Sequence, residues 1–229
     1  ISMLAFDTPL VEARFRSRYQ RFFAEVELLS GEIVTAHCAN TGRMTGLLLP
    51  GHRVWIRQQP PGRKLSHAWE LVETDSGLAC INTARANPLV AATDLGLWLP
   101  GTTFVRREPR MGAHRFDLEL SRNGAPVYVE IKSVTLCEEN IGYFPDAPSA
   151  RAVAHIQLLA ELAREGIETH VIFVAMHAGI LAVRPASKID PIFATACVNA
   201  QAAGVRFSAL SVTLTLNALS IQGLIPCEI

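Results

Sequence analysis

The sequence predicts a small antiparallel β-barrel followed by a mixed α/β domain. Three observations support this prediction. Short β-patterned runs separated by turns with glycine or proline fill the first third of the chain, strands and helices alternate after about Asn82, and 49% of the residues are apolar, enough to bury a core. We therefore expect a barrel domain over residues 3–83 and an α/β domain over residues 84–229.

The expected barrel strands are rich in β-branched and aromatic residues. They are residues 21–29, 32–39, 53–59, 68–74 and 77–83. Five short strands in fewer than about 80 residues are typical of an OB barrel. Strand propensity alone also allows an SH3-like barrel.

The segment "RFRSRYQRF", residues 14–22, allows two readings. As a strand it places Arg14, Arg16 and Arg18 on one face, whereas helical spacing groups Arg14 and Arg18 with Arg21. Its interleaved aromatic residues either belong to the barrel core or form a surface on which single-stranded nucleic acid stacks. If the segment is a surface for nucleic acid, Arg18 contacts the phosphate backbone.

The α/β domain is expected to begin with a helix over residues 83–99. Strands at 114–120 and 126–136 follow, joined by a turn at 121–126. The remaining elements are a helix at 150–165, a strand at 169–176, a helix at 189–204 and a strand at 205–216.

One apolar strand, "YVEIKSVT" at residues 128–135, carries a carboxylate and an ammonium two positions apart. Glu130 and Lys132 share a strand face. In the preceding strand, alternation places Phe116, Leu118 and Leu120 on one face and Asp117 on the other. Pairing through the Asn123-Gly124 turn then brings Asp117 towards Glu130 and Lys132.

Two converging carboxylates suit Mg²⁺, or Mn²⁺, because hard cations prefer oxygen ligands. Such a cation lowers the pKa of a bound water and polarises a phosphoryl oxygen, and Lys132 would orient the water or offset charge on the phosphate. The same short pattern is also typical of a solvated strand face with a weak ion pair.

Several other polar residues are candidates. Arg151 and His155 lie four residues apart on one helical face and would contact phosphate, or simply form a helix surface. Arg43, between the glycines of "ANTGRMTGLL", lies in an anion-binding loop or a tight turn. Glu108 and Glu119 are possible third ligands, although solvated positions are favoured.

Composition and charge argue against several classes of protein and of site. The formal net charge is zero, so no global positive field attracts nucleic acid, and only three of the 21 basic residues are lysines. Five scattered cysteines without a C-x-x-C pair argue against a disulfide framework or a zinc site. A start rich in charge and apolar runs too short to span a bilayer predict a cytoplasmic protein without a membrane segment.

Nine motifs resemble, in order, the bacterial sugar fermentation stimulation protein (SfsA) family. They are "RYQRFFAEVEL", "TAHCANTGRMTGLL", "PGHRVW", "HAWELVET", "INTARANPLV", "VEIKSVTL", "GYFPDA", "PASKIDP" and "AGV". The resemblance covers about Arg18 to Pro226. It implies an OB-fold followed by a PD-(D/E)xK nuclease-like domain, DNA binding and a regulatory role in maltose metabolism. The nuclease-like motif corresponds to Asp117, Glu130 and Lys132.

The chain departs from this family at the start of the helix expected at 150–165. The family commonly reads T-E-R-G-Q-K-H where this chain has Ser149 to His155, so Arg151 and His155 remain but the acid, glutamine and lysine are absent. The favoured hypothesis is a Mg²⁺-dependent nuclease that binds DNA. A non-catalytic DNA-binding regulator and a sensor or hydrolase of small phosphorylated molecules stay open, as does the oligomeric state.

Overall fold

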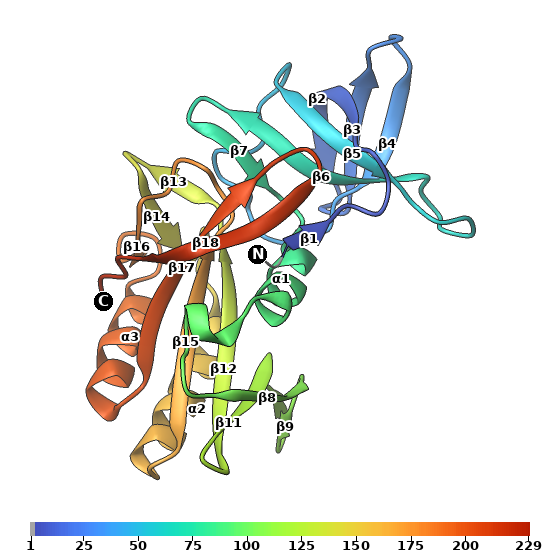
Figure 1. Ribbon diagram of the computed structural model, residues 1–229. Helices are drawn as coiled ribbons and strands as arrows, with labels where there is room; N and C mark the ends of the chain where they lie inside the picture. The colour runs from blue at the N-terminus through green and yellow to red at the C-terminus, as the bar shows by residue number, and fades with distance from the viewer. Residues whose placement is uncertain (1–2) are drawn as a thin grey trace.

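The computed structural model describes residues 3–229 and has a barrel at one end and an α/β domain at the other (Figure 1). Five strands form the closed barrel in the order β2-β3-β4-β6-β5, since β4 and β6 pair in parallel and β5 returns to β2. Their bounds are β2 Val11–Tyr19, β3 Phe23–Leu28, β4 Ile33–His37, β5 Arg53–Gln58 and β6 His67–Thr74. The barrel is therefore of the OB type, and the SH3-like alternative is not observed.

The barrel uses a strand that the sequence left ambiguous. Residues 11–19 form β2, whereas β7 (Gly77–Cys80), expected inside the barrel, only extends β6 outside the ring. Phe15 is buried and stacks on Trp69 with 5.1 Å between ring centroids, so it belongs to the core. Tyr19 and Phe22 are exposed. The core reading of residues 14–22 is thus confirmed for Phe15, while the nucleic-acid surface stays a prediction for the exposed rings.

The second domain is built on a seven-stranded mixed sheet with the order β1-β18-β17-β15-β12-β11-β8. The three central strands β12, β15 and β17 are parallel, and the others are antiparallel to their neighbours. The bounds are β1 Met3–Ala5, β8 Thr103–Arg107, β11 Leu118–Arg122, β12 Ala125–Val134, β15 Glu168–Ala175, β17 Arg206–Leu214 and β18 Ala218–Ile225.

Helices cover both faces of this sheet. α2 (Ala150–Arg164) and α3 (Pro191–Ala203) pack on one face, and the short α1 (Ala86–Ala92) packs on the other. The smaller elements are η1 Thr83–Arg85, η2 Leu95–Leu97, β9 Arg110–Met111, β10 His114–Arg115, β13 Leu136–Glu138, β14 Ile141–Phe144 and β16 Ala182–Pro185. The mixed α/β architecture agrees with the predicted fold class.

Two expectations need correction. The helix expected at 83–99 is three short pieces, because Thr93 is extended and the Asp94 side chain accepts from Gly96 N–H to start a new turn. The first strand, β1, lies outside the barrel and pairs with β18 at the other end of the chain. Its three residues carry no periodic signal, so the sequence did not predict this pairing. The predicted division at 83/84 itself stays a prediction.

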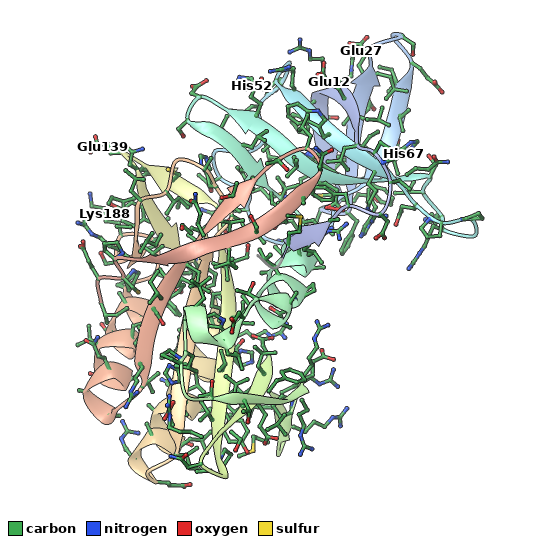
Figure 2. The ribbon with its side chains drawn as sticks, viewed as in Figure 1. Glu12, Glu27, His52, His67, Glu139 and Lys188 are labelled. Carbon is green, nitrogen blue, oxygen red and sulfur yellow. The ribbon has the colours of Figure 1, made fainter. Side chains whose placement is uncertain are left out.

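The two domains share a core. Trp55 and Leu71 of the barrel and Cys80 of β7 pack with the α1 side of the sheet. Cys80 N–H donates to the Met176 carbonyl at 2.9 Å, and Ala178 N–H donates to the Leu78 carbonyl at 2.8 Å. Labelled charged side chains such as Glu12 and Glu27 project from the barrel on the side away from the second domain (Figure 2). Within residues 3–229 no helix is long and apolar enough to cross a membrane.

Candidate active site

Strand β12 carries Glu130 and Lys132 into the face of the sheet that α2 and α3 cover. Its other face, with Val127, Val129 and Ile131, packs on the α1 side. The strand lies between β11 and β15, so neighbours on both sides hold its backbone. The predicted alternation of β12 is confirmed, and it explains why two charged side chains interrupt an otherwise buried strand.

Asp117 lies where the β11–β12 ladder ends. Its backbone N–H donates to the Val129 carbonyl at 3.1 Å, and its Oδ2 accepts from Ile131 N–H at 2.6 Å. The carboxyl group therefore takes the place that a strand partner would occupy beside Ile131. Oδ1 accepts from Asn87 of α1 at 2.6 Å, which fixes the side chain from the other face of the sheet.

The predicted face pattern around Asp117 is wrong. Phe116 packs in the α2–α3 core, whereas Leu118 and Leu120 pack on the α1 side. β11 begins only at Leu118, and residues 116–117 are outside a strand, so strict alternation does not apply there. The irregular backbone at this point lets Asp117 approach Glu130.

Glu130 is 4% exposed and its two oxygens have different surroundings. Oε1 accepts from Lys132 Nζ at 3.1 Å and lies 3.3 Å from His155 Nδ1. Oε2 is buried without a hydrogen-bond partner within residues 3–229. Burial raises the pKa of Glu130, but His155 and Lys132 outweigh it and hold the pKa below its ordinary value. Glu130 is therefore a buried carboxylate whose Oε2 is available only to the neighbouring Asp117 carboxyl or to a ligand.

The pKa of Asp117 is shifted in the opposite direction from that of Glu130. Burial, followed by the charge of Glu130 beside it, raises the pKa of Asp117 from 3.8 to about 7. A half-buried and a buried carboxyl group side by side cannot easily both ionise, and a cation between them stabilises the ionised forms. The unpartnered Oε2 and the raised pKa of Asp117 both fit a divalent cation at this pair.

Two further side chains complete the surroundings. His155 of α2 is buried and its Nδ1 lies 3.5 Å from Lys132 Nζ and 3.3 Å from Glu130 Oε1, so both side chains converge on Glu130. His114 of β10 meets His155 edge to face, with 6.1 Å between ring centroids. Neither His114 nor Asn87 was a sequence candidate, because only the docking of α1 and of the β9–β10 hairpin brings them here.

The other acidic candidates have partners of their own. Glu119 pairs with Arg106 at 2.8 Å, and Glu108 lies 3.6 Å from Arg115. In the described part of the chain, no group of three or more His, Cys, Asp or Glu residues forms a metal-binding cluster. A cation here would therefore have two carboxylates as its acidic ligands, with backbone carbonyls and water for the rest, which Mg²⁺ tolerates well.

Arg18 and Arg43 do not reach the carboxylate pair but lie at a separate pocket between the domains. This pocket, about 580 Å³, is lined by both arginines, by Arg21 and by Ser133 and Asp146 of the second domain. Arg18 donates to the Asn40 and Gly42 carbonyls at 2.7 and 3.0 Å, so its guanidinium holds the loop that carries Arg43.

Arg151 is exposed at the start of α2, while His155, expected on the same face, is buried against Glu130. Val153 and Ala154 are both half-buried. They stand where the family that the sequence motifs resemble commonly has glutamine and lysine. Neither side chain can replace the missing polar groups. The binding roles of Arg18, Arg43 and Arg151 remain predictions.

Comparison with known proteins settles the family. Residues 84–218 match the family described as "Sugar fermentation stimulation protein RE domain", and residues 17–81 match the "SfsA N-terminal OB domain". The chain belongs to the sugar fermentation stimulation protein (SfsA) family. Membership confirms the predicted fold class, an OB domain followed by a nuclease-like α/β domain.

SfsA relatives resemble the chain along nearly its whole length. The sugar fermentation stimulation protein homologues of Ectopseudomonas mendocina and Azotobacter vinelandii are each 44% identical, over 95% of this chain and 97% of the relative. The structure of Pyrococcus furiosus SfsA in complex with Ca²⁺ is 27% identical, with a TM-score of 0.88 over the full length of both chains.

Proposed function

We propose that this SfsA homologue binds DNA and cuts phosphodiester bonds with the help of Mg²⁺ or Mn²⁺. One observation carries the proposal: among the described residues 3–229, the buried Glu130 finds no hydrogen-bond donor for Oε2, and it lies next to Asp117, whose pKa is raised to about 7. An unpartnered carboxylate oxygen is costly unless a ligand uses it. The SfsA of Pyrococcus furiosus was solved with Ca²⁺, which agrees with a cation site in this family.

Each residue has a distinct role in this proposal. Asp117 and Glu130 hold the cation, which supplies an activated water and charge for the phosphoryl oxygens. Asn87 and Ile131 N–H keep the Asp117 carboxyl in place. Lys132 neutralises Glu130 and offsets negative charge on the phosphate, and His155 fixes both side chains from α2.

We also propose that the chain acts in the cytoplasm, with which its five free cysteines are consistent.

A cleavage assay tests the catalytic part. Labelled DNA and RNA, as single strands and duplexes, are incubated with the full chain and Mg²⁺ or Mn²⁺. We expect metal-dependent cutting that Asp117→Asn and Glu130→Gln each reduce at least about 100-fold, the typical cost of losing a group that stabilises the transition state.

Glu119→Gln is the matched control, because Glu119 is a half-buried acid on the neighbouring strand that is paired with Arg106. Its activity should stay close to that of the unmodified chain. Absence of cleavage of every substrate with either metal, in a protein that binds DNA, would contradict the catalytic part.

That outcome would favour the second candidate, a DNA-binding regulator that does not cut. A specific feature supports it: α2 presents Ala150, Val153 and Ala154 where the family commonly has an acid, glutamine and lysine. Regulation of sugar metabolism would then depend on binding alone. Binding should weaken with salt in proportion to the phosphates contacted and survive Glu130→Gln.

A further inference from the structure

The OB barrel carries a groove outside the site described above. It has a volume of about 320 Å³, and the residues that line it include Phe22, Phe23, His37, Arg63 and Lys64. Phe22 belongs to the turn between β2 and β3, and Arg63 and Lys64 belong to the loop at residues 59–66 between β5 and β6. These two loops border the surface on which OB folds in general bind oligonucleotides or oligosaccharides.

Exposed aromatic rings lie in this groove, at Phe22, and next to it, at Tyr19. Phe22 is 49% exposed and Tyr19 is 43% exposed. The Tyr19 ring stacks on the half-buried Phe23 ring with 5.3 Å between centroids, so Phe23 supports the exposed Tyr19 ring from one side. An exposed aromatic ring held in this way suits another flat ring, since every nucleobase has a face that stacks.

The charge beside the rings is positive. Lys64 Nζ lies 5.7 Å from the centroid of the Phe23 ring. Arg63 and Lys64 are exposed, and neither has a carboxylate within ion-pair distance in the part of the chain that the structure describes. The lining residues of the groove contain no acid. Cations without carboxylate partners next to exposed rings match a ligand that has both bases and phosphates.

The β2–β3 turn links the groove to the arginine-lined pocket between the domains. Gln20 and Arg21 both have positive φ, at 49° and 62°, which is unfavourable for residues other than glycine. Arg18 Nε donates to the Arg21 carbonyl at 3.2 Å and helps to hold this turn. As a result, Arg21 lines the interdomain pocket while the next residue, Phe22, lines the groove.

We propose that the nucleic acid bound by this chain is single-stranded, with unpaired bases on Tyr19 and Phe22 and a neighbouring phosphate at Arg21. This inference rests on the proposed function, because it names the form of the nucleic acid. Bases in a duplex already stack on one another and cannot reach the rings, so the groove selects unpaired strands.

Binding measured by fluorescence anisotropy tests this proposal. Labelled oligothymidylate and a duplex of equal length are titrated with the full chain in EDTA, which prevents cutting. We expect the single strand to bind at least about tenfold more tightly than the duplex. Phe22→Ala should weaken single-strand binding about tenfold, as expected for the loss of one stacked base, and Phe22→Trp should restore it.

Arg21→Gln separates phosphate contact from stacking. It should weaken binding and lower the slope of log K against log salt by about one, whereas Phe22→Ala should leave that slope unchanged. Phe104→Ala, at a ring 51% exposed in the other domain, and Arg164→Gln, at an exposed arginine of α2, are controls that should bind like the unmodified chain.

The outcomes distinguish this inference from the proposed function. Equal binding of duplex and single strand, or equal effects of Phe22→Ala and Phe104→Ala, would overturn the inference while DNA binding stands. Binding that depends on Phe22 without metal-dependent cleavage would support the inference and contradict catalysis. Binding of a maltooligosaccharide in place of the oligothymidylate, lost in Phe22→Ala, would also overturn it.

Discussion

At the scale of single residues, the decisive feature is the unequal state of two adjacent carboxyl groups. Glu130 is kept ionised by Lys132 and His155, while Asp117 beside it is easier to protonate. A divalent cation would remove that inequality, because it favours the ionised form of both groups. The pair is therefore under electrostatic strain that a bound divalent cation would relieve.

This strain predicts how stability depends on pH without divalent metal. The pKa of Asp117 is about 7 in the folded chain and near its ordinary value of 3.8 when unfolded. Between these values the folded chain keeps a proton that the unfolded chain releases, so the contribution of Asp117 to stability is full below about pH 4 and lost as pH rises through about 7.

Asp117→Asn removes this titration. Relative to the unmodified chain, the variant should gain stability as pH rises from about 4 to about 8, measured by chemical denaturation in EDTA. A stability difference that stays constant across this pH range would show that Asp117 is not perturbed as described.

At the scale of elements, the network around Glu70 of β6 holds the segment that supports Asp117. Glu70 is fully buried and accepts from Arg85 of η1 at 2.8 Å, from Arg57 of β5 at 3.1 Å and from Asn82 at 3.0 Å. Asn82 caps η1, and Arg85 ends η1 directly before α1, which carries Asn87. The barrel thus fixes the position of the helix that orients the Asp117 carboxyl.

Glu70→Gln should therefore be strongly destabilising, by about 3–5 kcal/mol, because it leaves two arginines without their charge partner. For a chain of this size that corresponds to a fall of roughly 10 °C in Tm, measured by calorimetry. Glu73→Gln, on the same strand but in a half-exposed pair with Arg53, should cost less than about 1 kcal/mol. Equal effects of the two substitutions would contradict this role of Glu70.

At the scale of the whole molecule, the two domains meet where β7 passes residues 176–178. Gly77 is essential to this approach, since its φ is +121° and a Cβ there would lie 2.8 Å from the Ala178 Cβ. The close contact permits the backbone hydrogen bond between Ala178 and Leu78. The interdomain pocket depends on the same docking.

Gly77→Ala should lower the free energy of unfolding by about 2 kcal/mol or more, through backbone strain together with the collision. Gly31→Ala is the matched control, because Gly31 also has positive φ but has nothing within 4 Å of its added Cβ. Thermal unfolding compares the two variants. If Gly31→Ala costs as much, the interdomain contact contributes little.

The sequence predicted the architecture better than the details of the site. Strand alternation correctly placed Glu130 and Lys132 on one face, and the hairpin correctly brought Asp117 close to Glu130. Alternation failed at Phe116, because the backbone leaves the strand at Asp117 to reach Ile131 N–H.

Other features of the structure have no local signal in the sequence. Asn87 and His114 reach the site only through tertiary docking, and the pairing of β1 with β18 joins opposite ends of the chain.

A crystal structure of the chain with Mn²⁺ tests the central claim most directly. The account predicts an anomalous density peak that contacts a carboxylate oxygen of Asp117 and the Oε2 of Glu130, and the loss of that peak in Glu130→Gln. A metal-soaked structure in which both side chains keep their present contacts, with no ion between them, would contradict it.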